Sequence, residues 1–402
     1  MIIPVLLTWR DFFTHGTGHE NSNAVSSLTF FVSNTAMKNV RFDALQSVRG
    51  LAALVVVFRH VLTCYPLSSH TATVAVFFLF NSPAAVTLFF VLSGFVLTHS
   101  LVGQSFSTET VLIFWTRRVF RILPALIVVT LLSALYTRTP LAGWPVAGSD
   151  PSMAALLAHD MPLSLTLFAK CLASVSSALV PQNWTVAVEL IAAVFFPFLW
   201  AASRNESRIF LPVVLLSLAL SIFAPSGGKG LPFIYGFSFV VGVIAYRGWQ
   251  NTNVILTSAG VLLAAVGMSL PTTLLTEPET LGAVFSSPKR GIPEAICAGF
   301  LLFGLARNGT IAGLLTNRPL LWVGDISFSL YLVHFLVIAI AGRLLSPFLP
   351  AFSMPIRESM VFCLTLLIAL PLSHLLYEKV EKPANRLGHR LSLLFKPSRR
   401  IS

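Results

Sequence analysis

The stretch "RGLAALVVVFRH", residues 49–60, decides the class of fold. Apolar residues fill it almost completely, yet an arginine begins it and a histidine ends it. Similar apolar runs recur along the chain: 55% of the 402 residues are hydrophobic, 10% are charged, and the mean hydropathy is +0.81. This composition is typical of an integral membrane protein. It predicts an all-α membrane bundle to which the quoted stretch contributes the first span.

The number of spans follows from the length that crosses a bilayer, about 20 apolar residues. Candidate spans are centred near residues 56, 88, 128, 194, 217, 239, 262, 299, 334 and 368. If both chain ends are cytoplasmic, eighteen of the 27 Lys and Arg residues fall in cytoplasmic loops or the tail, and six fall in the opposite loops. The positive-inside rule therefore predicts about ten transmembrane helices with both termini cytoplasmic.

The net charge of +12 does not indicate nucleic acid, because no hydrophilic domain gathers the basic residues. Membrane lipids explain the charge better, above all for the tail. We expect three parts: an N-terminal extension over residues 1–40, a transmembrane domain over 41–380 and a basic cytoplasmic tail over 381–402. Met37 precedes a charged lead into the first span, so the extension is predicted to lie upstream of the true start.

Arg49 and His60 are eleven positions apart, which brings them to nearly the same helix face after three turns. The rise between them is about 16 Å. Arg49 is therefore expected at the cytoplasmic rim and His60 deep in the outer half of the bilayer. Ionisable groups at such depth usually face a bundle interior or an aqueous cavity, which makes them functional candidates. A histidine that only bonds a neighbouring helix is the structural alternative.

Three arginines begin the third span in "WTRRVFRILPAL", residues 115–126. Arg118 and Arg121 stand about one turn apart, with Arg117 beside them, and guanidinium groups on one face suit phosphate oxygens. Ordinary positive-inside anchoring is the alternative. Together with a deep histidine, the pair favours a phosphate-rich cytosolic donor of the shape of coenzyme A, with the three arginines as its binding residues.

Glu189 lies in "QNWTVAVEL", residues 182–190, and is expected just inside the outer end of the fourth span. A carboxylate there needs a partner, and a pair with His60 at similar depth is permitted by the topology. A structural tie to an arginine is the alternative. Trp184 is read as an interface residue that can also border a substrate groove.

A polar stripe follows in "GDISFSLYLVH", residues 324–334, where Ser327, Tyr331 and His334 share one helical face. Such a stripe marks either helix packing or a substrate groove. In the second span, the small residues Ser93 and Gly94 favour close helix packing. The four cysteines lie in or beside different apolar segments without metal-ligand spacing, so no metal site is expected.

Together these motifs resemble the bacterial membrane acyltransferase family 3, whose members O-acylate cell-surface sugars and other exported acceptors. The resemblance spans about residues 40–386 and is carried by "RFDALQSVRGLAALVVVFRHV", "FFVLSGFVL", "RRVFRILPAL", "NWTVAVEL", "GDISFSLYLVH" and "VEKPANR", in the order and spacing of the family. It implies a ten-helix fold in the bacterial inner membrane. Phe328 departs from the family, which usually has tyrosine there.

The resemblance implies transfer of an acyl group, most often acetyl, from acyl-CoA to a hydroxyl of an exported carbohydrate or glycoside. Acetyl-CoA would be a co-substrate, and no tightly bound cofactor is expected. A sugar hydroxyl is a weak nucleophile, so His60 is expected as general base, with Glu189 and Arg49 completing the catalytic group. An acyl-imidazole on His60 is the covalent alternative. A transporter that uses buried His, Glu and Arg is the main alternative function.

Overall fold

A computed structural model describes residues 42–65, 75, 78–146, 157, 164–204, 208–225, 228–275 and 288–395. Throughout these ranges the regular elements are helices: α3 (Asp43–Cys64), α5 (Ser82–Ser100), α6 (Thr108–Tyr136), η1 (Pro140–Gly143), α8 (Leu165–Leu172), α9 (Asn183–Ala202), α10 (Phe210–Phe223), α11 (Leu231–Asn251), α12 (Ser258–Leu275), α14 (Pro288–Arg307), α15 (Gly309–Leu315), α16 (Arg318–Leu345), η2 (Leu349–Ala351), α17 (Met354–Leu376), the π-helical η3 (Tyr377–Glu381), α18 (Lys382–Ser392) and η4 (Leu393–Phe395). The N-terminal extension and the predicted start at Met37 lie outside the described residues.

Each of the ten predicted span centres lies within a helix. Among the described residues, seven helices are long and apolar enough to cross a membrane, and α14 with α15, bent by 93°, makes an eighth if the two form one span. The helices α10 and α12 are apolar but shorter in their described parts. The all-helical prediction is confirmed. Ten crossings, and the side on which each terminus lies, stay predictions.

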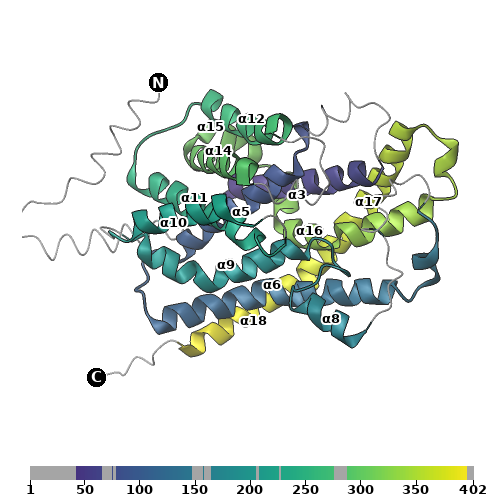
Figure 1. The fold of residues 1–402 in the computed structure, drawn as a ribbon, viewed down its shortest axis with the longest axis horizontal. Helices are drawn as coiled ribbons and strands as arrows, with labels where there is room; N and C mark the ends of the chain where they lie inside the picture. Colours follow the sequence, from purple (N-terminus) through teal and green to yellow (C-terminus); the bar gives the residue numbers. More distant parts are fainter. Residues whose placement is uncertain are drawn as a thin grey trace, which may run out of the picture.

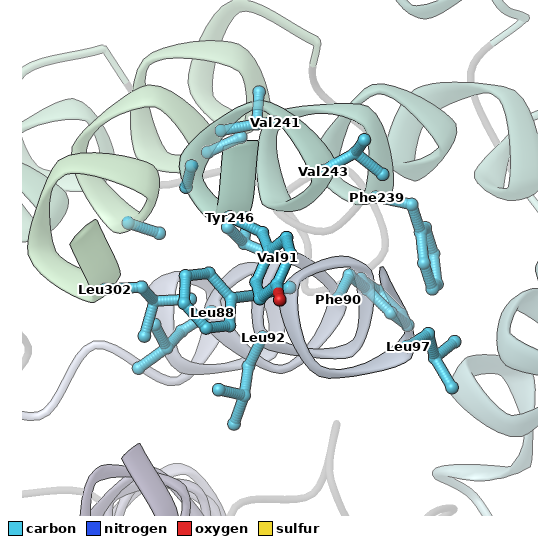
Figure 2. Close-up of a cluster of buried hydrophobic side chains, with 14 of the residues drawn as sticks. Leu88, Phe90, Val91, Leu92, Leu97, Phe239, Val241, Val243, Tyr246 and Leu302 are labelled. Carbon is cyan, nitrogen blue, oxygen red and sulfur yellow. The ribbon is translucent and has the colours of Figure 1, made fainter. Parts of the chain in front are cut away.

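The core of the bundle lies where α5 and α11 pack against each other and against α14. Figure 2 shows the side chains of Leu88, Phe90 and Val91 from α5 beneath Phe239 and Val241 from α11. Outward faces are apolar as well, since leucines of α10 and α12 are more than half exposed. An apolar core together with an apolar exterior fits a protein that has lipid as its solvent.

Glycines let two pairs of helices touch backbone to backbone. A Cβ on Gly94 would clash with the carbonyl oxygen of Phe239, and a Cβ on Gly242 would clash with that of Val91, so no side chain fits between α5 and α11 at these two positions. A Cβ on Gly50 or Gly324 would likewise meet the backbone of α16 or α3. Close packing at Gly94 is thus confirmed, and it is the usual role of small residues between membrane helices.

Helix caps fix where the site-bearing helices begin. The side chain of Ser107 accepts a hydrogen bond from the Thr110 amide at the start of α6, and Asn317 does the same for Leu320 in α16. Such caps satisfy amides that have no partner within the helix. α6 therefore begins ten residues before Arg118, which places this arginine about 15 Å along the helix. Where the third span begins along α6 stays a prediction.

The segment from α17 through η3 to α18 returns alongside α6. Figure 1 shows α18 and α6 side by side along the lower edge of the molecule, and the contacts between them are extensive. A Cβ on Gly388 would clash with the side chain of Phe120, and Ser392 is buried. The part of the predicted tail that the structure describes is thus helical over residues 382–395 and packs on α6.

The glycine contact between α5 and α11 generates a stability prediction. Gly94→Ala adds a Cβ that must push the two backbones apart, because backbone atoms cannot move aside as a flexible side chain can. We expect it to lower the free energy of unfolding by about 1–3 kcal/mol. The change is measured as a lower midpoint of thermal unfolding in detergent.

Gly236→Ala is the matched control for this experiment. Gly236 lies in α11, but a Cβ there meets no atom within 4 Å. The substitution should be neutral or stabilising by roughly 0.5–1 kcal/mol, since alanine favours a helix. Equal midpoints for Gly94→Ala and Gly236→Ala would contradict the backbone contact.

Candidate active site

An open cavity enters the bundle between α3, α5, α6, α9 and α16. Its polar lining consists of Arg49, Ser93, Arg118, Arg121, Thr185, Glu189, Ser327 and Tyr331. The apolar lining includes Phe89, Phe90, Leu92, Ile122 and Phe328. Residues separated by as much as 282 positions in the sequence thus meet around one space, with a charged part and an apolar part.

Arg118 and Glu189 form an ion pair in the wall of this cavity. Nη2 of Arg118 donates to Oε2 of Glu189 at 3.2 Å, and the hydroxyl of Ser93 donates to the other carboxylate oxygen at 3.3 Å. The predicted pair of Glu189 with His60 is therefore wrong, and the alternative, a tie to an arginine, holds. The physical reason is helix packing, because α6, which carries Arg118, packs against α9, which carries Glu189.

The other two cavity arginines bind partners that do not line the cavity. Nη1 of Arg121 donates to Glu381 at 2.7 Å, and its guanidinium lies 5.5 Å from the centre of the Phe328 ring. Nη2 of Arg49 donates to the backbone carbonyl of Gly324 at 2.7 Å. Arg118 and Arg121 of α6 thus line one cavity together with Arg49 of α3.

The cavity lining carries a positive charge. Three guanidinium groups face one carboxylate, that of Glu189, and even with buried Glu381 counted behind the wall the positive groups outnumber the negative ones. Guanidinium groups with donors to spare bind phosphate oxygens well. The charged part of the cavity is therefore suited to an anionic, phosphate-bearing ligand.

His60 and His334 form a buried pair next to the cavity. Nδ1 of His60 and Nε2 of His334 are 3.2 Å apart, and Nδ1 of His334 is 2.6 Å from the backbone carbonyl oxygen of Tyr331. A carbonyl only accepts, so His334 donates from Nδ1 and, when neutral, accepts at Nε2. His60 must then donate from Nδ1. Its Nε2 is left with the lone pair and is the basic nitrogen of the pair.

Tyr331 connects the histidine pair to the cavity. It lines the cavity, and its ring centre is 5.5 Å from that of His334, which in turn lies 5.0 Å from His60. Its hydroxyl is 3.0 Å from the hydroxyl of Thr185. The predicted stripe on α16 is thus divided, because Ser327 and Tyr331 face the cavity whereas His334 faces His60.

Two predicted site residues lie elsewhere. Arg117 is exposed, and its Nε donates to the hydroxyl of Ser392 on α18 at 3.0 Å. Trp184 is half-buried and packs against Tyr235, with ring centres 5.7 Å apart. Neither residue lines the cavity.

Sequence reasoning missed Gln182 and Glu381. The side-chain nitrogen of Gln182 donates to the backbone carbonyls of Tyr331 and Leu332, which ties the start of α9 to the helix that carries His334. Glu381 is buried against Arg121. Both residues stand in motifs quoted above, but the partner of each is more than 140 positions away, so no local pattern reveals the contact.

The residues that the structure describes contain no group of three or more His, Cys, Asp or Glu side chains that could hold a metal ion. The ionisable groups of the site instead have protein partners: Arg118 pairs with a carboxylate, Arg49 donates to a backbone carbonyl, and His60 contacts His334.

Comparisons with known proteins indicate the class of enzyme. A family model described as an acyltransferase domain matches residues 42–377. The acyltransferase MdmB of Streptomyces mycarofaciens is 28% identical over 381 residues, which cover 87% of this chain and 92% of that protein. No solved structure gives a significant match. The match decides between an enzyme and a transporter. The chain belongs to the membrane acyltransferase family 3 that its motifs resemble, and it is a multi-pass membrane enzyme that transfers acyl groups.

Proposed function

We propose that this enzyme transfers an acyl group, most often acetyl in the family, from acyl-CoA to a hydroxyl of an exported carbohydrate such as exopolysaccharide or lipopolysaccharide. The observation that carries the proposal is the placement of a cavity with three arginines beside a histidine pair that has a defined basic nitrogen. The bacterial inner membrane is the proposed location, because the donor is made in the cytosol and the acceptor is displayed outside.

The arginines would bind the donor. Arg118 and Arg121 face the cavity from one side of α6, and Arg49 faces it from α3. Phosphate groups of coenzyme A would lie among them, and the uncharged arm with its thioester would follow the apolar lining toward Tyr331. Phosphate binding at Arg118 competes with its ion pair to Glu189, so donor binding would free this carboxylate.

His60 would activate the acceptor. Its Nε2 takes the proton of the attacking hydroxyl while the hydroxyl oxygen forms a bond to the thioester carbonyl carbon. The carbon–sulfur bond then breaks, and the leaving thiolate recovers the proton from the imidazolium. His334 acts as a positioning residue, because its hydrogen bond to Tyr331 sets which nitrogen of His60 is basic.

Replacement of His60 tests the chemistry. His60→Ala removes the base, so we expect ester formation on the acceptor to fall to background while the protein still reaches the membrane at wild-type levels. The measurement is the amount of base-labile acyl ester on surface glycans, by proton NMR, in deletion cells rescued with each variant. The chemical shifts also identify the acyl group and the position on the sugar that carries it.

Two further variants sharpen this experiment. His389 is exposed on α18, far from the pair in the fold, so His389→Ala should rescue fully. His334→Ala keeps the base but loses the tautomer control, so it should give an ester level between those of wild type and His60→Ala. Loss of the correct tautomer lowers the kcat of serine proteases about 10⁴-fold. Full rescue by His60→Ala would refute the mechanism.

Replacement of Arg118 tests donor binding. Loss of a charge-assisted hydrogen bond costs about 1.5–3 kcal/mol. We therefore expect Arg118→Ala to raise the KM for acetyl-CoA by roughly ten- to a hundredfold, with a smaller change in kcat. Steady-state kinetics in proteoliposomes measure both constants.

The matched control is its neighbour on α6, Arg117, which is exposed and does not line the cavity. Arg117→Ala removes the same charge from the same turn and should leave the KM within twofold of wild type. If the two variants raise the KM equally, general surface charge rather than the cavity attracts the donor.

A further inference from the structure

The short π-helical segment Tyr377–Glu381 directly follows α17. A π-helical turn inserts an extra residue into the helix and occurs often at functional sites. Here the turn ends in Glu381, whose side chain is 0% exposed. A carboxylate buried in this way is costly unless it is paired and hydrogen-bonded.

Both oxygens of this carboxylate have partners. Oε2 accepts from Nη1 of Arg121 at 2.7 Å, and Oε1 accepts from the hydroxyl of Ser329, which is fully buried on α16. The Arg121 side chain is 25% exposed. Glu381 thus binds one nitrogen of the Arg121 guanidinium, and Arg121 also lines the cavity.

Phe328 restricts the same guanidinium from a second direction, at 5.5 Å from the ring centre. An arginine that is gripped by a buried carboxylate and lies over a ring loses most of its freedom before a ligand arrives. It uses one of its five N–H donors on Glu381 and keeps the others for a ligand. Such preorganisation lowers the entropy cost of binding.

Tyr377, at the start of the turn, makes a second hydrogen bond that connects the turn to the cavity helices. The hydroxyl of Tyr377 donates to Oδ1 of Asp325 at 3.4 Å, and this oxygen also accepts from Nε2 of Gln46 at 2.7 Å. Gln46 stands one helical turn before Arg49 on α3. One turn of chain therefore contacts Arg121 directly and the helix of Arg49 through Asp325.

We propose that the Tyr377–Glu381 turn is a positioning element of the donor site and that Glu381 orients Arg121 toward the phosphate groups of acyl-CoA. This inference rests on the proposed function. Glu381 itself touches no substrate and acts through Arg121. Its effect should appear for donors that carry the nucleotide phosphates and be absent for donors that lack them.

The experiment compares acetyl-CoA with acetyl-pantetheine, which has the same thioester arm without phosphates, on the full-length enzyme in proteoliposomes. Glu381→Gln should raise the KM for acetyl-CoA about tenfold, equivalent to about 1.4 kcal/mol. Its kcat with acetyl-CoA should stay within twofold, and its kcat/KM with acetyl-pantetheine should be unchanged. An equal loss with both donors would show a merely structural role and overturn the proposal, as would an unchanged KM for acetyl-CoA.

The chain offers a matched control in the same turn. Glu378 is three residues earlier, its side chain is 36% exposed, and it pairs with Lys382 at the surface. Glu378→Gln should leave both donors unaffected. A KM increase as large as that of Glu381→Gln would attribute the effect to the charge of the turn and contradict the assignment to Glu381.

A second comparison covers the case in which Glu381→Gln does not accumulate in the membrane. Arg121→Gln leaves Glu381 with its hydrogen bond from Ser329 but without its arginine, and the double variant with Glu381→Gln leaves no ionised group at this position. If Glu381 acts through Arg121, the single variant Arg121→Gln and the double variant should have the same raised KM for acetyl-CoA, because the effects of coupled residues are not additive. A further increase in the double variant overturns the proposal. Failure of the wild-type enzyme to use acetyl-CoA would instead refute the proposed function.

Discussion

Charge inside a bundle built for lipid is the constraint on which the site depends. An ionised side chain in such a place needs a partner, and the cost of leaving it without one is several kcal/mol. Three arginines of the cavity satisfy this constraint in three ways: Arg118 with Glu189, Arg121 with Glu381, and Arg49 with the Gly324 carbonyl. These contacts join α3 to α16, α6 to α9, and α6 to the turn after α17 around the cavity. The cavity is the space that remains between them.

The backbone contacts at glycines serve the same arrangement. Gly50 and Gly324 let α3 and α16 touch beside Arg49, and the carbonyl that Arg49 binds belongs to Gly324 itself. The same two helices carry His60 and His334 farther along. One close helix pair therefore supports both parts of the site, the charged end for the proposed donor and the histidine end for the proposed chemistry. A change in the separation of these helices would act on binding and chemistry together.

Local sequence patterns predicted the helices and several of the residues that line the cavity. Each apolar run became a helix, because in lipid the backbone must satisfy its own hydrogen bonds. The arginine pair on α6 follows from helical spacing and lines the cavity, as do Ser327 and Tyr331 of the stripe on α16, whereas His334 does not. Spacing does not give which helices are neighbours: α6 packs against α9, so Glu189 meets Arg118 rather than His60. The motif that contains Glu381 contributed to the resemblance, but its contact with Arg121 spans 260 positions.

The most direct test of the account is a cryo-electron microscopy structure of the enzyme in nanodiscs with a non-transferable acetyl-CoA analogue. The account predicts phosphate oxygens within about 3 Å of the Arg118 and Arg121 guanidinium groups. It also predicts a broken ion pair between Arg118 and Glu189, and the analogue's thioester position on the side of Tyr331 and His60. An analogue bound away from the three arginines, with that ion pair intact, would contradict the central claim.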